Sequence, residues 1–111
     1  MKIPDDAIIA DEKITGYLLV PREQDDKSKF LAQAGFTQEN PKLLKAAIRQ
    51  LADSTLATKD RDNEYGVFYR VTGELIGLNQ RNLAVITVWL QRNADRKFQF
   101  ITLKPNRETF R

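Results

Sequence analysis

The 111-residue chain contains neither histidine nor cysteine. Histidine is the side chain that most readily changes charge near neutral pH, and cysteine supplies thiolate nucleophiles and metal ligands. Without these two residues, most simple enzyme mechanisms, disulfide bonds and thiolate metal sites are excluded.

Long apolar segments are also missing. The longest apolar run, Leu83–Leu90, is far shorter than the roughly 18 to 20 residues of a membrane-spanning helix. The N-terminus lacks the basic and then apolar pattern of a secretion signal. We therefore expect a cytoplasmic protein that makes no membrane contact.

Motifs for nucleotide and metal chemistry are absent as well. The sequence has no glycine-rich phosphate loop, no dinucleotide-binding fingerprint and no serine-hydrolase elbow. The alternating carboxylates Asp60, Asp62 and Glu64 lack the glycine and the final glutamate of a calcium loop. The sequence therefore predicts neither a metal site nor a cofactor.

What the chain does contain suits one folded domain over residues 1–111. Hydrophobic residues make up 41% and charged residues 30%, the balance of a globular protein rather than a disordered one. Residues 1–40 carry five basic and eight acidic side chains, whereas residues 81–111 carry seven basic and two acidic ones. The C-terminal third can therefore attract a polyanion such as nucleic acid, although an ordinary solvated surface has similar statistics.

Helix signals occupy the first half of the chain. A short helix follows Asp11, which is a favourable capping residue. A second helix, capped by Asp25 or Asp26, runs to Ala34 and precedes Gly35, which suits the left-handed position after a helix end. A third helix begins with Pro41 and continues to Asp53, with apolar residues on one face and basic residues on the other.

Strand signals occupy the second half. Residues rich in β-branched and aromatic side chains form Tyr65–Thr72, Leu83–Arg92 and Phe98–Lys104, with turn-forming residues between them. A fourth strand, Leu56–Arg61, precedes these three and pairs across a turn. The order predicts an α+β fold in which about three N-terminal helices pack on one face of a four-stranded antiparallel meander.

Side chains on a strand alternate between the two faces of the sheet, so each strand divides into two sets. The more apolar set, expected to pack on the helices, comprises Val67, Tyr69, Val71, Ile86, Val88, Leu90, Ile101 and Leu103. The other set comprises Phe68, Arg70, Thr72, Thr87, Trp89, Phe100 and Thr102. This mixture of aromatic, hydroxyl and basic groups indicates a binding surface, and a one-residue register shift would exchange the two faces.

Lys27 is the most unusual residue of the helical half. It shares an i, i+3, i+4, i+7 spacing with Phe30, Leu31 and Ala34, which places a positive charge on an apolar helix face. One interpretation is that its methylene groups cover the core while its ammonium reaches water or pairs with Asp26. The other is that the ammonium binds phosphate or donates a proton.

Trp89 is the chief candidate for contact with a nucleobase. Stacking on an aromatic ring contributes about 1 to 3 kcal/mol per base, and Phe68, Phe100 or Arg70 would be its companions. A lone tryptophan in a strand also commonly packs in the core, because it buries a large apolar area. Tyr65, which precedes a glycine near the start of a strand, is the tyrosine that we expect to reach a site.

Several segments resemble a bacterial domain family of unknown function, and the resemblance spans nearly the whole chain. It rests on Leu18–Leu19, Asp26–Leu31, Gly35–Phe36, Tyr65–Gly66, Tyr69–Val71, Gly73, Gly77, Val85, Thr87, Trp89 and Phe100–Pro105. Members of that family look like toxin domains, which occur beside a small β-rich gene product or as tails of secreted toxins. Their order of helices and strands is similar to that of the barnase, EndoU, colicin and RelE ribonucleases, by analogy of fold rather than by a shared motif.

The resemblance also implies a set of site residues. The family pattern falls on Lys27, Tyr65, Arg81, Thr87, Trp89 and Thr102. Toxin-tail members often have a histidine beside the helix lysine, where this chain has Asp26, so the resemblance favours cleavage without histidine. In such RelE-like chemistry, basic and tyrosine side chains stabilise charge on the scissile phosphate while the RNA 2′-hydroxyl attacks.

The leading hypothesis is a toxin of a toxin–antitoxin pair that acts on RNA, as a ribonuclease that uses neither metal nor histidine. Its expected catalytic residues are Lys27, Tyr65, Arg70 and Thr87. Its expected RNA-binding residues are Trp89, Thr102, Arg81 and Phe68. Two alternatives stay open: a non-enzymatic module that binds a small β-rich partner or a second copy of itself, and an RNA-binding domain without catalysis.

Overall fold

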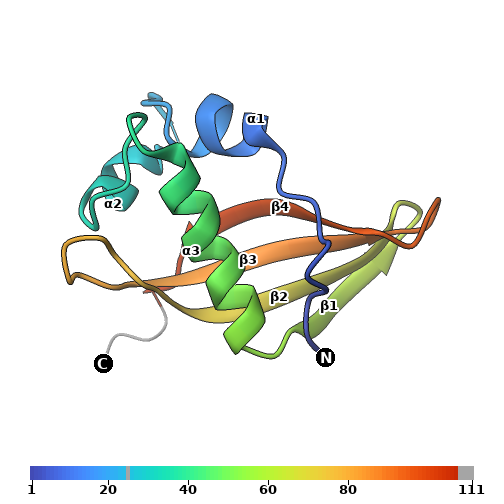
Figure 1. The fold of residues 1–111 in the computed structure, drawn as a ribbon. Helices are drawn as coiled ribbons and strands as arrows, with labels where there is room; N and C mark the ends of the chain where they lie inside the picture. Colours follow the sequence, from blue (N-terminus) through green and yellow to red (C-terminus); the bar gives the residue numbers. More distant parts are fainter. Residues whose placement is uncertain (25, 108–111) are drawn as a thin grey trace.

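The computed structural model describes residues 1–24 and 26–107, in which short helices precede one antiparallel sheet (Figure 1). The elements are α1 (Asp11–Lys13), η1 (Ile14–Leu18), α2 (Ser28–Ala32), α3 (Pro41–Ser54), β1 (Thr58–Asn63), β2 (Gly66–Leu75), β3 (Leu83–Arg92) and β4 (Phe98–Pro105). The strands lie in the order β1-β2-β3-β4, and each pairs antiparallel with its neighbour. The predicted α+β fold is therefore confirmed.

The first helical segment continues from α1 into η1, a π-helical turn. The Leu19 amide donates to the Ile14 carbonyl, five residues back, which is the wide hydrogen-bond pattern of a π-helix. Ile14 and Leu18 are buried in the core, whereas Tyr17 is only half-buried. Asp11 is the first residue of α1 rather than its capping residue.

The other two predicted helices form, with one shortened. Asp26 accepts hydrogen bonds from the amide and the hydroxyl of Ser28, so α2 begins later than expected and is only five residues long. Gly35 has φ +93°, as expected for a residue beyond a helix end. Helix α3 begins with Pro41 as predicted and buries Leu44, Ala47, Ile48, Leu51 and Ala52.

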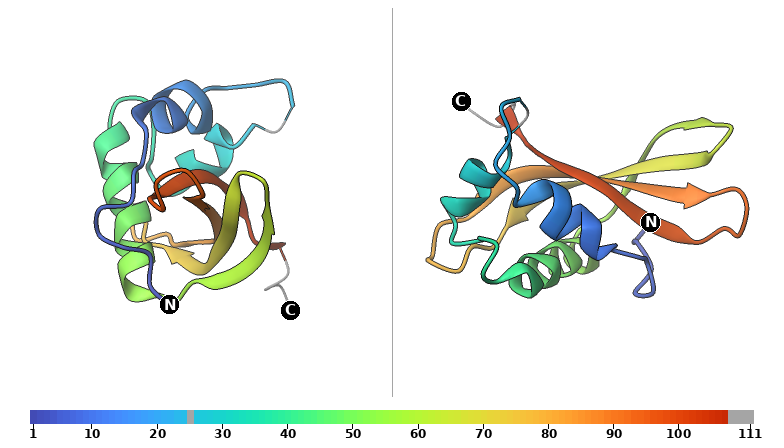
Figure 2. Two further views of the ribbon diagram at one scale, coloured as in Figure 1. Left: turned by 90° about the vertical axis from the view of Figure 1, so that its right-hand side faces the viewer. Right: turned by 90° about the horizontal axis from the view of Figure 1, so that it is seen from above.

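Helix α3 lies across one face of the sheet, over β2 (Figures 1 and 2). The side chain of Leu51 in α3 packs directly on Gly73 of β2, where an added Cβ would lie 2.9 Å from the Leu51 Cδ1 atom. A residue without a side chain is needed at this point for the helix to sit so close to the sheet. Gly73 therefore identifies the face of the sheet that the helices cover.

This contact shows that the predicted faces of β3 are exchanged. Gly73 pairs with Val85, and alternation from Val85 turns Thr87 and Trp89 toward the helices. Both are fully buried, with no exposed surface. The sequence-based prediction, which places them on the uncovered face, is wrong for this strand.

The predicted faces of Phe100 in β4 and of the other β3 residues are also exchanged. Phe100, which pairs with Trp89, is buried in the core instead of lying on the uncovered face. Ile86 and Val88 are only partly buried, and Leu90 is buried outside the main core cluster. The error has a simple cause: β3 is apolar on both faces, so its pattern does not say which set faces the helices.

A short chain of hydrogen bonds satisfies the polar groups beneath α3. The Trp89 indole N–H donates to the Thr87 hydroxyl over 2.9 Å, and this hydroxyl donates to the Val71 carbonyl over 3.1 Å. The Trp89 ring meets the Phe100 ring edge to face, with centroids 5.4 Å apart. Thr87 thus allows an indole to be buried without an unpaired N–H group.

The two edges of the sheet differ. The N-terminal segment lies alongside β4 and forms a parallel bridge with it, because the Ile8 amide donates to the Phe98 carbonyl and the Phe100 amide donates to the Ile8 carbonyl. All six residues of β1, at the opposite edge, are exposed. Among the described residues, no helix is long and apolar enough to cross a membrane.

Replacing Thr87 by valine should destabilise the fold. Valine keeps the shape of threonine but removes the acceptor of the buried Trp89 N–H group, so the free energy of unfolding should fall by about 1–3 kcal/mol. Thr72→Val, at an exposed position of β2, is the matched control and should change stability much less. Urea denaturation of the two variants tests this, and equal stabilities would contradict the structural role of Thr87.

Candidate functional site

The half-buried ammonium of Lys27 holds together three distant parts of the chain. Its Nζ atom donates hydrogen bonds to the Tyr17 hydroxyl over 3.2 Å and to the Thr102 hydroxyl over 3.1 Å. Tyr17 belongs to η1, Lys27 precedes α2, and Thr102 belongs to β4. The structure therefore gathers one ammonium and two hydroxyl groups at the β4 edge of the sheet.

Local structure explains how Lys27 reaches this position. Asp26 is engaged by the Ser28 amide and hydroxyl, and no ion pair joins Lys27 to Asp26 among the described residues. Lys27 itself occupies the residue before the first turn of α2, so its side chain leaves the helix end toward β4. The Lys27 ammonium meets two hydroxyl groups rather than Asp26, and its binding of phosphate or donation of a proton stays a prediction.

The three residues border a cleft of about 530 Å³ between η1 and β4. The lining residues are Glu12, Lys13, Tyr17, Lys27, Ile101 and Thr102. A third basic group lies nearby, because the Arg22 guanidinium carbon is 5.2 Å from the centre of the Tyr17 ring. The cleft thus brings two ammonium groups, the Glu12 carboxylate and two hydroxyl groups together, with the Tyr17 ring and Ile101 as its apolar surfaces.

A bulge in β4 helps to shape this cleft. Val88 of β3 pairs with Thr102, but the next residue, Trp89, pairs with Phe100, which leaves Ile101 as an additional residue in β4. A bulge of this kind changes the direction of neighbouring side chains. Here it allows the consecutive residues Ile101 and Thr102 both to line the cleft.

Tyr17 is the residue of the cleft whose acidity is altered. The hydrogen bond from Lys27 lowers the pKa of Tyr17 below its ordinary value, with further lowering by the Thr102 hydroxyl and by the positive charges of Lys27 and Arg22. Partial burial acts in the opposite direction and is outweighed. The cleft therefore makes Tyr17 easier to ionise than a free tyrosine, and an ionised tyrosine can accept a proton.

Two of the residues predicted from the sequence, Lys27 and Thr102, meet in this cleft. Tyr17 was missed, because its periodic spacing with Ile14 and Leu18 is equally typical of a packed helix face. Only the contact with Lys27 distinguishes Tyr17 from a packing residue. Thr87 and Trp89 lie in the core, where no face of the indole is open to a base.

The other predicted residues lie elsewhere. Tyr65 is 67% exposed in the turn between β1 and β2, and Arg81 is exposed in the loop between β2 and β3. Arg70 is exposed on β2 and Phe68 is partly buried on the same strand. None of these four lines the cleft at Lys27.

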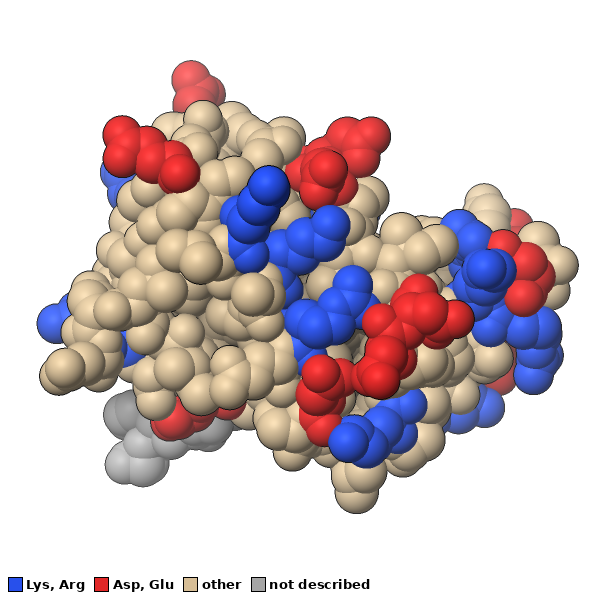
Figure 3. All heavy atoms as spheres, viewed as in Figure 1, with Lys and Arg blue, Asp and Glu red and all other residues tan. Residues whose placement is uncertain are grey.

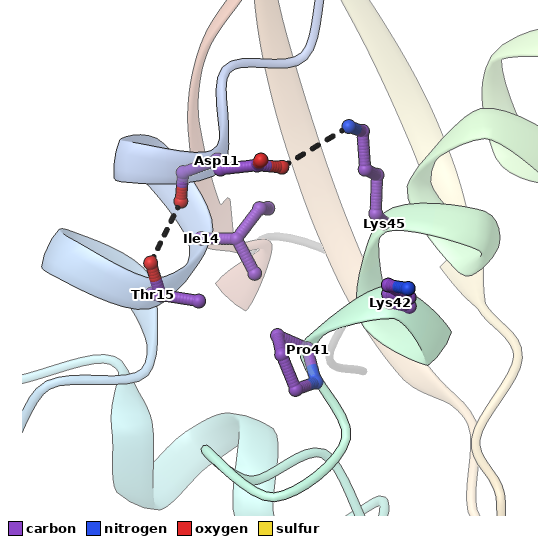
Figure 4. A pocket seen from close by; sticks show the side chains of 6 residues that line it. All are labelled: Asp11, Ile14, Thr15, Pro41, Lys42 and Lys45. Carbon is purple, nitrogen blue, oxygen red and sulfur yellow. Dashed lines mark hydrogen bonds and ion pairs between the residues drawn. The ribbon is translucent and has the colours of Figure 1, made fainter.

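A second cleft, of about 520 Å³, separates α1 and η1 from the start of α3 (Figure 4). Its lining residues are Asp11, Ile14, Thr15, Pro41, Lys42 and Lys45. The Lys45 ammonium lies 3.2 Å from the Asp11 carboxylate, so an ion pair joins the two walls. None of the site residues predicted from the sequence lines this second cleft, whereas Lys27 and Thr102 line the first one.

Charge on the helix-covered side of the molecule is mixed. On the face drawn in Figure 3, basic and acidic side chains lie next to one another. Such alternation produces no extended field of one sign. The described residues also contain no group of three or more carboxylates placed to hold a metal ion.

Removing the Lys27 ammonium should make Tyr17 harder to ionise. Lys27→Met deletes both the hydrogen-bond donor and the charge, so the pKa of Tyr17 should rise toward the ordinary value of about 10. Tyrosinate absorbance followed against pH measures this, with Tyr17→Phe to identify the step and Lys29→Met as the control. A titration that is unchanged in Lys27→Met would contradict the assigned contact.

The same pKa has a defined effect on stability. The folded-state pKa of Tyr17 lies below its unfolded-state value, so ionised Tyr17 favours the folded chain. This contribution is fully present above the unfolded-state pKa and is lost as pH falls through the folded-state pKa. Tyr17→Phe should therefore lower stability more in alkaline solution than at neutral pH, as measured by denaturation at both.

Comparisons with known proteins place this geometry in context. The fold is similar to a solved structure of a contact-dependent growth inhibition toxin–immunity protein complex from Klebsiella pneumoniae 342, with a TM-score of 0.64 and 14% sequence identity. The similarity covers 91% of this chain and 94% of the matched chain. A comparison with curated protein sequences found no match. Residues 2–107 match the family model described as a domain of unknown function (DUF6883), and the chain belongs to that family.

Proposed function

We propose that this chain is a toxin domain that acts on RNA and cleaves it in the cleft at Lys27. The observation that carries the proposal is the cluster formed by the Lys27 ammonium with the Tyr17 and Thr102 hydroxyls. An ammonium held between two hydroxyl groups, beside an arginine and an open cleft, suits the binding of a phosphodiester.

The comparisons support the toxin part of the proposal. The similar solved structure is a complex of a growth inhibition toxin with an immunity protein. The similarity extends over nearly the full length of both matched chains, so it concerns the whole arrangement of helices and sheet rather than one motif. The sequence resemblance to toxin-like domains points to the same class independently of the cleft.

The chemistry of the cleft fits cleavage without histidine. Ionised Tyr17 takes the proton of the RNA 2′-hydroxyl, whose oxygen then bonds to phosphorus. The bond from phosphorus to the 5′ oxygen breaks, and this oxygen takes a proton from Lys27. The products are a 2′,3′-cyclic phosphate and a 5′-hydroxyl end, and the 3.2 Å hydrogen bond between Lys27 and Tyr17 returns the proton.

The basic groups around Tyr17 stabilise charge rather than transfer protons in this scheme. Lys13 and Arg22 add positive charge where the attacked phosphate gains negative charge, which lowers the barrier to the reaction. Thr102 fixes the Lys27 ammonium and acts as a positioning residue. In this scheme Tyr17 takes the proton-transfer role that the sequence suggests for Tyr65.

A non-enzymatic interaction module is the alternative from another class. The similar structure is a complex in which a toxin and an immunity protein are bound to each other. The exposed strand β1 has no strand beyond it in the described part of the chain, and a β-rich partner can add a strand to such an edge. An antitoxin-like partner is compatible with both functions.

Expression in bacteria tests the toxin proposal. We expect induction of the wild-type chain to arrest growth and degrade RNA, whereas Lys27→Ala and Tyr17→Phe should restore growth. Lys29→Ala removes the same charge two residues away, outside the cleft, and should remain toxic. Normal growth with intact RNA on wild-type expression, at a verified level of folded protein, would contradict the proposal.

Purified protein tests the mechanism. Cleavage of single-stranded RNA should persist in EDTA, because every proton in the scheme is moved by protein side chains. The new ends should be a cyclic phosphate and a 5′-hydroxyl, and 2′-O-methyl RNA should resist cleavage because it has no free attacking hydroxyl. Loss of activity in EDTA, or cleavage of 2′-O-methyl RNA, would rule out this mechanism.

A further inference from the structure

The face of the sheet that α3 leaves uncovered, which we call the open face, has its own composition. In the described part of the chain no helix lies over it (Figure 2). Its side chains are identified by alternation from the helix-facing residues. They are Thr58, Arg61 and Asn63 on β1, Phe68, Arg70, Thr72 and Glu74 on β2, Ala84, Ile86, Val88, Leu90 and Arg92 on β3, and Gln99, Thr102 and Lys104 on β4.

Strand register connects the open face to the cleft at Lys27. Arg70 pairs with Val88, and Val88 pairs with Thr102, so these three residues form a row across the sheet. The last member of the row, Thr102, accepts the hydrogen bond from Lys27. Two strand spacings separate Arg70 from Thr102, a distance of about 10 Å.

The open face carries four basic side chains, Arg61, Arg70, Arg92 and Lys104, and one acidic side chain, Glu74, so its net charge is positive. Val88 and Ile86, at its centre, are only partly buried. Arg70 lies on one side of them and Lys104, which pairs with Ile86, lies on the other. An apolar strip between two cations suits a flexible polyanion whose bases contact the strip and whose phosphates contact Arg70 and Lys104.

A planar stacking surface lies at the far side of the same face. The Arg61 guanidinium carbon is 4.7 Å from the centre of the Phe68 ring, with which it shares a register position. The guanidinium group presents a flat surface on which an unpaired base can stack. The Phe68 ring is thereby already covered, which makes Arg61 the group that would meet a base.

From these contacts we infer that the open face is the binding groove for a single-stranded RNA that runs from the cleft at Lys27, over Val88, to Arg70 and the Arg61–Phe68 pair. The inference rests on the proposed function and names its substrate class. A single strand is required because a duplex hides its bases from the apolar strip. Arg70, Lys104 and Arg61 then hold the substrate, while the cleft carries out the reaction.

Binding of an uncleavable ligand tests this groove. The probe is a fluorescein-labelled, unstructured 2′-O-methyl RNA of about ten nucleotides, within the length range that single-strand sites bind. We expect Arg70→Gln with Lys104→Gln to weaken binding about tenfold and to reduce the slope of log affinity against log salt by about 1.4, from 0.7 per phosphate contact. The control, Lys29→Gln with Lys42→Gln, removes the same charge outside the open face and should change affinity less than about twofold.

The outcomes separate this inference from the proposed function. Equal losses in the two double variants, or equal affinity for a duplex, would overturn the groove. A loss in Lys27→Ala without any loss in Arg70→Gln with Lys104→Gln would confine binding to the cleft, and the proposed ribonuclease would stand without the groove. Binding of the probe that depends on Arg70 and Lys104, together with no cleavage of unmodified single-stranded RNA, would support the groove and overturn the ribonuclease. A wild-type chain that does not bind the RNA probe, but forms a stable dimer or binds an acidic protein, would overturn the groove.

Discussion

The packing of α3 against one face of the sheet is the constraint on which the rest of the molecule depends. The contact is close because Gly73 has no side chain beneath Leu51. It fixes which residues of β3 are buried, so Trp89 and Thr87 become core residues. Because α3 covers one face of the sheet and no other helix in the described part of the chain covers the other, the same packing leaves the opposite face open.

The two candidate functional surfaces share a single strand. β4 contributes Thr102 to the cleft and Lys104 to the open face, and its bulge at Ile101 turns two consecutive residues toward the cleft. The helices beside this edge supply Tyr17 and Lys27. The sheet edge therefore holds the Lys27 ammonium in place through Thr102. Functional groups that are supported by a strand are held more precisely than groups on loops.

The chain contains no histidine, and the proposed acid–base chemistry relies on Tyr17 instead. A tyrosine alone is a poor base at neutral pH, because its ordinary pKa is about 10. A hydrogen bond from an ammonium and a nearby guanidinium lower this pKa in the folded chain. The lowered pKa of Tyr17 thus arises from its tertiary contacts with Lys27, Thr102 and Arg22.

The sequence alone determined the classes of residue and the order of elements. Pro41 marked the start of α3, the β-branched segments marked the strands, and Lys27 stood out as a charge on an apolar helix face. These features are local, since capping, propensity and periodicity depend on neighbouring residues.

Tertiary structure decided which of these residues meet. The pattern of β3 is apolar on both faces, so only the contact at Gly73 revealed that Trp89 points inward. Tyr17 is ten residues from Lys27 and 85 from Thr102 in a sequence that gives no sign of their contact. Their meeting depends on the path of the chain around the β4 edge, and no local rule encodes that path.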